Sequence, residues 1–412
     1  MDRLNLLALA IRYQALRNER SSWDVAWRDL ADHFLPTRFE VDSDTGQIKP
    51  EILNARVSDS TGIIDMGVLA AGTQGGMSSP ARPWFKLALS DGDAEGDGDV
   101  AAWLDEVTER MRTMLHRSNF YNAAHALYAD LGTFGSGLLI ETADWNGLNF
   151  RIIPAGEYVL DVDDKGEVDT FMYRLRMTAR QIIQKFEERN IPHHILTEAQ
   201  KPASTERLHD VVHAVFPNSD RAYGRMDRMN MPWRSVWWLN GGSMSMNGGS
   251  PCVLRESGFR DFPAFAPRWE VSGVKKYGRS PAMNVLPDCR MLQQMGATTL
   301  KATHKAVDPP ILAPARFKAV EVQNFPGGVT YFDPQDANLS TFQVLHQVDP
   351  RIIAVAEEKI RSVQQKVHDG LFVDLFKMLI MDDRRNITAT EIEAREREKM
   401  ILLGPVVERL DR

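Results

Sequence analysis

The sequence predicts an α+β fold in which a mixed helix-and-sheet module is followed by long C-terminal helices. Three observations support this. Apolar residues recur every three or four positions in the first 34 residues and again over 100–134. From Leu138 to Met177 apolar and polar residues alternate, as in antiparallel strands. Two long helical patterns then flank a short strand-and-turn segment, which predicts a two-helix stalk with a small cap.

The N-terminal pattern predicts two helices. The first covers residues 3–19, and the second covers Trp23–Phe34, with Ser22 as its N-cap and Pro36 after its end. A Gly- and Ala-rich helix is expected after Ser60, and its small side chains predict a tight interface with another backbone. It leads into residues 75–89, GGMSSPARPWFKLAL, which predict a rigid turn and then a β-like apolar run.

The middle of the chain is expected to alternate between helices and sheet. An acidic loop, residues 91–99, precedes two helices, Val100–His116 and Asn119–Phe134, the second ended by Gly135 and Gly137. The first helix carries an apolar side made of Trp103, Val107, Met111, Met114 and Leu115. Strands are predicted over 138–177 and near 211–216, 236–239 and 253–256, with a short helix at Ala179–Glu188.

The stalk pattern occupies the C-terminal third. A helix over roughly Asp288–Ala306 must end at Asp308-Pro309-Pro310, because proline lacks the N–H that a helix needs. The second helix, Pro350–Phe376, would be about 40 Å long at about 1.5 Å per residue. Its broad apolar face exceeds what one antiparallel partner covers, which predicts further packing by neighbouring subunits. After a break at Lys377–Ile387, a capping box predicts a last helix, kinked at Gly404-Pro405.

Composition narrows the class of function. The 412 residues carry a formal net charge of −7 with 49 Lys and Arg, which argues against a protein that grips nucleic acid by its phosphates. Two cysteines predict free thiols in a reducing compartment. No apolar run approaches the roughly 20 residues of a membrane span, and the N-terminus does not match a signal peptide, so we expect no membrane contact.

The sequence does not match the known motifs for catalysis or for binding of a cofactor or metal. Residues 67–74 have the glycine spacing of a phosphate loop but place Thr73 where its lysine belongs. Residues 161–166 resemble a calcium loop with Lys165 at a ligand position, so a β-turn is favoured. Trp237-Trp238 are interpreted as core or interface residues rather than a base-stacking platform. The sequence therefore predicts no catalytic residue, no metal and no cofactor. One rival remains open, a metal-dependent nuclease using Asp161, Asp163 and Asp382.

Several segments resemble the portal proteins, or head-to-tail connectors, of short-tailed tailed bacteriophages. Gly75–Phe85 resembles that family's Gly-x-Thr-Ser-Pro-x-Arg-Pro-Trp-Phe segment. Further matches are Trp27-x7-Leu35-Pro36, Pro267-Arg268-Trp269, Tyr277-Gly278-Arg279-Ser280-Pro281, Thr388-Ala389-Thr390-Glu391-Ile392 and Leu403-Gly404-Pro405. Each motif alone is weak, but together they run from about residue 20 to the C-terminus.

The resemblance implies a portal fold with an α/β wing, a two-helix stem, a small α/β clip insert and a kinked C-terminal helix. It assigns 1–280 to the wing, 281–306 to the first stem helix, 307–349 to the clip, 350–376 to the second stem helix, 377–387 to the tunnel loop and 388–412 to the kinked wing or crown helix. The family continues beyond Gly-Pro, so the crown is expected to be short or absent, or else the sequence is cut.

Roles are implied in the same way. The tunnel loop would face DNA with Lys377, Asp382, Asp383, Arg384 and Arg385, and the clip would dock partners around Phe325, Pro326, Gly327 and Gly328. Structural roles fall to Pro80, Arg82, Pro83, Trp84, Phe85, Gly404 and Pro405, with Trp84 and Phe85 expected to be buried in a wing corner.

The implied function is non-enzymatic. About twelve copies would form a ring at one capsid vertex, a conduit for double-stranded DNA during packaging and ejection. The partners would be the terminase large subunit, tail adaptor proteins, and capsid and scaffolding proteins, in the virion and, during assembly, in the host cytoplasm. A ring-forming tail adaptor is a second alternative.

Overall fold

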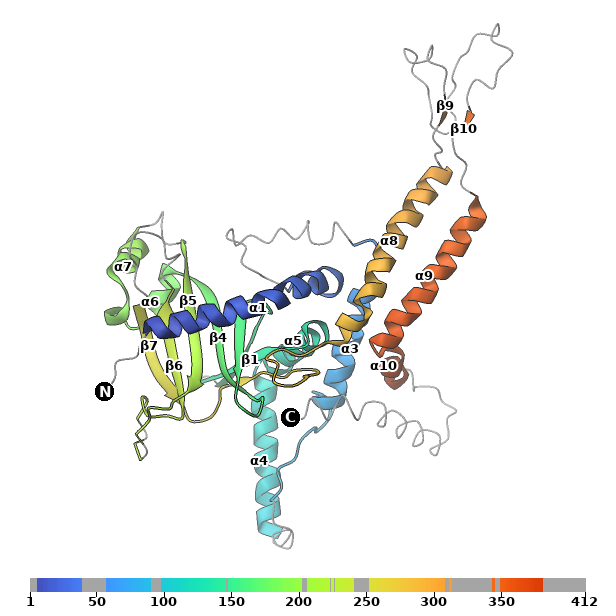
Figure 1. Cartoon of the computed structure of the whole chain (residues 1–412). Helices are drawn as coiled ribbons and strands as arrows, with labels where there is room; N and C mark the ends of the chain where they lie inside the picture. Colours follow the sequence, from blue (N-terminus) through green and yellow to red (C-terminus); the bar gives the residue numbers. More distant parts are fainter. Residues whose placement is uncertain are drawn as a thin grey trace.

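The computed structural model describes residues 6–38, 57–89, 98–145, 147–201, 206–222, 224–225, 227–240, 252–307, 311–312, 343–344 and 349–380. Within these ranges the antiparallel strands lie in the N-terminal part, where helices pack on the sheets, and a helix pair makes up the C-terminal part (Figure 1). The predicted α+β class is confirmed.

The N-terminal helix α1 (Leu6–Phe34) is continuous, so the prediction of two helices was wrong. Both serines at the expected break bond back into their own helix, Ser21 to the Asn18 carbonyl at 2.6 Å and Ser22 to the Glu19 carbonyl at 3.4 Å. Arg20 also pairs with Asp24 at 2.8 Å across the same point. A serine that bonds three residues backward does not act as an N-cap, so nothing interrupts the helix.

A five-stranded antiparallel sheet forms the centre of the N-terminal part. Its order is β3 (Tyr158–Val162), β4 (Val168–Thr178), β5 (Leu208–Pro217), β6 (Trp233–Leu239) and β7 (Cys252–Phe259). The first half of α1 covers one face through Leu9, Tyr13 and Leu16. The helices α6 (Ala179–Lys185) and α7 (His193–Gln200) join the core on the opposite face. Both faces are thus buried, and Trp237 and Trp238, which point to opposite faces, are both core residues as predicted.

A smaller sheet joins this module to the C-terminal helices. It contains β2 (Gly147–Ile153), β1 (Leu138–Asp144) and β8 (Ala264–Phe265), next to α5 (Phe120–Phe134). As predicted, Gly135 ends α5, with a φ of 77°. A Cβ there would also overlap the Gly278 carbonyl, so the glycine lets the segment before α8 lie directly against the end of α5.

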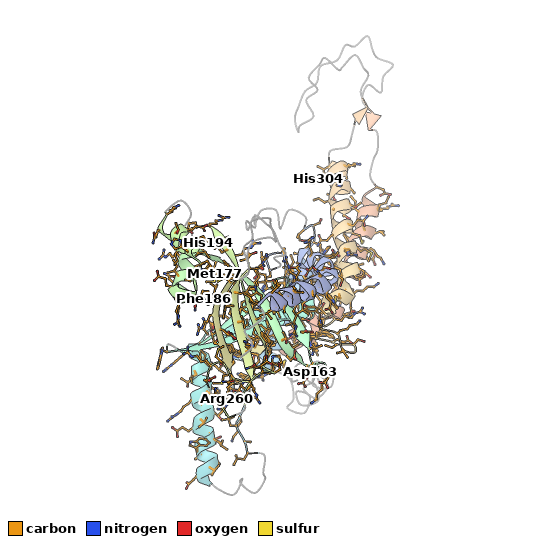
Figure 2. The ribbon with its side chains drawn as sticks, turned by 60° about the vertical axis from the view of Figure 1, so that its left-hand side comes forward. Asp163, Met177, Phe186, His194, Arg260 and His304 are labelled. Atoms are coloured by element: carbon orange, nitrogen blue, oxygen red, sulfur yellow. The ribbon has the colours of Figure 1, made fainter. Side chains whose placement is uncertain are left out.

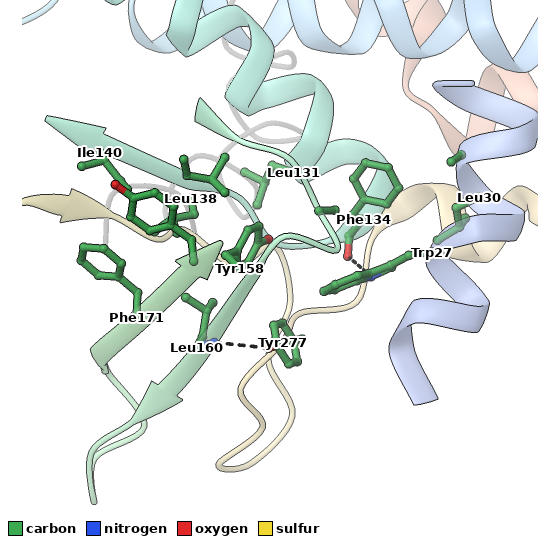
Figure 3. Close-up of a cluster of buried hydrophobic side chains, with 14 of the residues drawn as sticks. Trp27, Leu30, Leu131, Phe134, Leu138, Ile140, Tyr158, Leu160, Phe171 and Tyr277 are labelled. Atoms are coloured by element: carbon green, nitrogen blue, oxygen red, sulfur yellow. Dashed lines mark hydrogen bonds between the residues drawn. The ribbon is translucent and has the colours of Figure 1, made fainter. Parts of the chain in front are cut away.

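Aromatic side chains close the junction between these parts (Figure 3). The Trp27 indole of α1 donates to the Phe134 carbonyl at 3.0 Å, and the Tyr277 hydroxyl accepts from the Leu160 amide at 3.2 Å. The Trp27 and Tyr277 rings meet edge to face with centroids 5.1 Å apart. Each polar group is thereby satisfied inside the core.

The small residues of helix α3 (Thr61–Met77) permit close packing, as predicted. A Cβ on Gly72 would overlap the Phe376 ring, and the Leu69 and Met66 side chains lie against Gly132 of α5. Residues 67–74, which resemble a phosphate loop, form part of this helix.

The segment after α3 differs from the expectation. Trp84 and Phe85 are half-buried rather than buried, and residues 86–89 form no strand. The Trp84 ring stacks on Phe120 at 5.9 Å and meets the Phe85 ring edge to face at 4.7 Å. The backbone of Leu87 instead bonds to a side chain of α4 (Gly98–Arg117), the Thr108 hydroxyl, at 3.2 Å. Figure 1 shows α4 projecting away from the sheets.

The C-terminal part is an antiparallel helix pair that extends from the module (Figure 1). The helix α8 (Pro281–Val307) begins seven residues earlier than Asp288 and contains Pro287. Two short strands, β9 (Ile311–Leu312) and β10 (Gln343–Val344), pair beyond its end. The return helix α9 (Pro350–Gly370) stops before Phe376, and α10 (Val373–Ile380) follows, so Lys377 is helical and not in a loop.

Candidate functional site

The helix pair α8–α9 packs through residues at heptad spacing. Val285, Leu292 and Thr299 recur every seven positions in α8, and Ile360, Val363 and Val367 form the corresponding row in α9. Val285 and Val363 are buried. A Cβ on Gly370 would overlap the Val285 side chain, so this glycine sets how closely the two helices cross at their base.

One side of the pair is clamped to residues 58–61, just before α3. The Gln293 side chain of α8 accepts from the backbone amides of Ser58 and Asp59 at 2.6 and 3.0 Å and donates to the Asp59 carbonyl at 2.5 Å. From α9, the Gln364 side chain donates to the carboxylate of Asp59 at 3.0 Å. Both helices are therefore bound to the same short segment, α8 through Gln293 and α9 through Gln364.

A contact between a histidine and an aspartate lies below this clamp. Nδ1 of His368 in α9 lies 2.6 Å from a carboxylate oxygen of Asp65 in α3, and Asp65 is buried. Burial raises the pKa of Asp65, and the neighbouring His368 opposes that shift. The pair fixes the rotation of α9 about its own axis relative to α3.

The junction between α9 and α10 is sharply turned. Phe372 has a φ of 58°, in the left-handed region that non-glycine residues seldom adopt. Leu371 before it is fully buried, whereas Phe372 is half-buried. Phe376 lies against Gly72, which docks α10 on α3 and leaves Lys377 exposed.

The outer half of the pair leaves apolar side chains uncovered. Four of them are more than half exposed: Leu300 57%, Val307 81%, Ile352 65% and Val355 66%. Figure 2 shows this half, marked by His304, standing clear of the sheets. Leu300 and Val307 are seven residues apart in α8, and Ile352 and Val355 are three apart in α9, so each helix exposes two neighbouring apolar groups to solvent.

The residues predicted for the turn at 75–85 lie on the surface around α4 and α5. Pro80, Arg82 and Pro83 are exposed, and the Arg82 guanidinium donates to the Gly75 carbonyl at 2.9 Å, which closes the turn. Trp84 Nε1 lies 3.4 Å from the Tyr121 hydroxyl. Of the predicted DNA-facing residues the structure describes Lys377 alone. Asp382, Asp383, Arg384, Arg385, the 325–328 turn and Gly404-Pro405 lie outside the described residues.

Sequence reasoning missed the polar clamp. Gln293, Gln364 and His368 sit at helix positions that look solvent-facing, because glutamine and histidine are common on exposed helix surfaces. The sequence offered one indication of their role, the place of these residues on the helix surface. Gln364 and His368 are four residues apart, on the α9 side opposite its lysines, and only the folded chain brings Asp59 and Asp65 beside them.

The proposed nuclease residues have other partners. Asp161 pairs with Arg12 at 2.8 Å and with Lys276 at 3.1 Å, and these hydrogen bonds lower its pKa against the opposing effect of burial. Asp163 accepts the amides of Lys165 and Glu167, as expected for the predicted turn. In the part of the chain that the structure describes, no three potential ligands gather into a metal site. Cys252 and Cys289 are free thiols, as predicted.

None of the described helices combines the length and apolarity needed to cross a bilayer.

Comparison with known proteins identifies the family of the chain. Residues 7–412 match the family described as bacteriophage head to tail connecting protein. The portal protein of Salmonella phage epsilon15 is 36% identical over 400 residues, which cover 96% of this chain and 70% of that protein. A probable portal protein of Bordetella phage BPP-1 is 33% identical over 409 residues, covering 98% and 71%. The chain belongs to the family of bacteriophage head-to-tail connecting proteins, the portal proteins.

Proposed function

We propose that the chain is one subunit of a ring at a capsid vertex, through which double-stranded DNA enters and leaves the head. Family membership makes the chain a structural component of the virion rather than an enzyme, and it favours the connector over the nuclease and tail-adaptor alternatives. The ring has about twelve copies. Its partners are the terminase large subunit, tail adaptors, and capsid and scaffolding proteins, met in the host cytoplasm during assembly.

The observation that carries the proposal is the helix pair with its uncovered apolar edges. Val285 of α8 lies opposite Gly370 of α9, and the two helices run in opposite directions. Leu300 is 15 residues after Val285 and Val355 is 15 residues before Gly370, so Leu300 and Val355 lie at the same level along the pair. Leu300 lies seven residues after Gln293, on the clamped side of the pair, and Val355 lies nine residues from Gln364, on the other side. Two different patches at one level make a head-to-tail contact, which closes into a ring when copies repeat.

The regions of the chain take their roles from this arrangement. The module up to residue 280 is the wing, α8 and α9 are the stem, and residues between them are the clip that docks the motor and tail proteins. The segment after α9 leads to the tunnel loop, where Asp382, Asp383, Arg384 and Arg385 meet the DNA. The Arg82–Gly75 turn with Trp84 and Phe85 is a corner of the wing.

Negative-stain images of the purified full chain test the proposal. We expect closed rings with a central channel and a narrow projection formed by the helix pairs. Incubation with DNA and Mg²⁺ should yield no cleavage products. A monomer that cleaves DNA would support the nuclease, and a ring without the projection would support a tail adaptor.

A further inference from the structure

The outer edges of two strands are closed by side chains. At the outer edge of β3 the Arg20 guanidinium donates to the Tyr158 carbonyl at 2.5 Å. At the outer edge of β2 the Asn119 side chain donates to the Phe150 carbonyl at 2.7 Å and accepts from the Phe150 amide at 2.8 Å. Backbone groups that already bind side chains are not available to another strand. Neither edge is therefore open to pairing at these positions.

The edge at β7, the other end of the five-stranded sheet, is open. β7 has one extra residue, Leu254, between the partners of Trp237 and Trp238, which makes a β-bulge. Residues 255–259, after the bulge, pair one to one with β6. Among the residues that the structure describes, none outside β6 forms a hydrogen bond with the backbone of this segment. These five residues thus present a row of backbone groups that can accept another strand.

A second segment has the sequence pattern of a strand but no strand partner. Residues 85–89, FKLAL, form neither helix, strand nor turn. The Leu87 amide donates to the Thr108 hydroxyl of α4 at 3.2 Å. Within the described ranges no hydrogen bond reaches the backbone of Lys86 or Ala88, and both residues are exposed. In a strand the backbone groups of neighbouring residues point to opposite sides, so those of Lys86 and Ala88 would point away from α4.

We propose that residues 85–89 of one copy pair with residues 255–259 of β7 in the next copy and extend its sheet to six strands; this rests on the ring proposed above. Addition of a strand to an open edge satisfies backbone groups of both partners at once. Both segments are five residues long, about 17 Å in a strand. The donor and the acceptor are different surfaces, as a head-to-tail contact requires. Figure 1 shows α4, to which Leu87 is bound, apart from β7, so the two segments of one chain do not meet.

The first test links the two segments in assembled rings of the full chain. Leu87→Cys and Ser257→Cys place thiols at the middle of each segment, so they come opposite one another for either strand direction. Cys252→Ser in the same chain leaves only the buried Cys289 as a native thiol. A short crosslinker for thiols should join most chains into dimers and longer ladders on a denaturing gel. The control carries Leu208→Cys, at an exposed position of β5, in place of Leu87→Cys and should stay monomeric on the gel.

The second test removes one backbone donor. Ala88→Pro deletes an amide that would bond to β7, whereas Leu89→Pro deletes one on the α4 side. In rings of Ala88→Pro, the amides of residues 255–259 should exchange hydrogen about tenfold or more faster than in wild-type rings. Rings of Leu89→Pro should match wild type.

The outcomes separate the strand pairing from the ring itself. Rings that give no crosslinked chains, or that crosslink as readily through Leu208→Cys, would overturn the pairing and leave the ring intact. Equal exchange of residues 255–259 in wild-type and Ala88→Pro rings would overturn it as well. Failure of Ala88→Pro alone to assemble, with the circular dichroism of wild type, would support the pairing. A wild-type protein that forms no rings would contradict the ring and the pairing together.

Discussion

Asp130 lies in α5 with 1% of its surface exposed, and one of its carboxylate oxygens has no hydrogen-bond partner. The other oxygen is 3.3 Å from the Arg38 guanidinium, which follows the end of α1. Burial raises the pKa of Asp130 to about 7, although Arg38 acts in the opposite direction. A carboxyl with a raised pKa keeps its proton in the folded chain after the unfolded chain has released it.

The fold should therefore lose stability as the pH rises from about 4 to 7. Below this window Asp130 is protonated in both states, and above it the folded chain bears the full cost of a buried charge, on the order of 4 kcal/mol. Asp130→Asn should abolish that part of the pH dependence. Denaturant unfolding of both proteins between pH 4.5 and 8 gives the difference. Parallel curves for the two proteins would show that Asp130 is not the responsible group.

Leu371 and Leu300 offer a comparison between a buried and an exposed leucine of the same helix pair. Leu371 has no exposed surface, whereas Leu300 is 57% exposed. Leu371→Ala should lower the free energy of unfolding by roughly 2–5 kcal/mol, because it buries less apolar surface and leaves a cavity. Leu300→Ala should cost well under half as much in the unassembled chain, so thermal melts of the two variants should differ clearly. Equal melting temperatures would mean that the packing around Leu371 relaxes.

At the scale of elements, α3 and α10 depend on one glycine. The Phe376 ring occupies the space that a side chain at Gly72 would need, while nothing lies within 4 Å of a Cβ at Gly67 in the same helix. Gly72→Val should displace α10 from α3 at a cost of roughly 1–3 kcal/mol. Gly67→Val should be neutral or slightly stabilising, because valine has the better helix propensity.

Hydrogen exchange of the α10 amides measures this displacement directly. Faster exchange over residues 373–380 is expected in Gly72→Val and not in Gly67→Val. Slow exchange retained in both variants would contradict the role assigned to Gly72.

The strands were predictable from sequence because their alternation is regular. Phe171 and Tyr173 face one side, Met172 faces the other, and both sides are buried against helices. The end of α9 was not predictable. The three-and-four spacing of apolar residues continues past Gly370 to Leu375. The turn depends on the left-handed backbone of Phe372, and a phenylalanine at that position does not predict such a conformation.

The candidate site was partly predictable for the same reasons. The two stem helices follow from periodicity and from Pro309-Pro310, which stops the first of them. The faces of the pair could not be assigned, because which side is clamped depends on Asp59 and Asp65, more than 200 residues away. The tunnel-loop and clip assignments remain predictions from the resemblance.

At the scale of the whole molecule, the exposed edges of the pair decide whether copies associate. Leu300→Asp would place a charge at the edge proposed to meet Val355 of the next copy, and burial of an unpaired carboxylate is costly. We expect monomers or small oligomers in place of rings by light scattering and electron microscopy. Leu208→Asp is the matched control, since Leu208 is also about half exposed, at 52%, but lies in β5. Intact rings with Leu300→Asp would move the subunit contact elsewhere.

The continuous helix α1 connects the five-stranded sheet to α8. Its first half is fixed to the five-stranded sheet, where the Tyr13 and Trp238 rings meet at 6.1 Å, and its last turns are paired with α8 through Asp29 and Arg290. A continuous helix of 29 residues, about 44 Å long, has no loop at which it could bend easily. A force along α8 would therefore be transmitted through α1 to the sheet. In the proposed ring, such stiffness would keep the channel at a constant width.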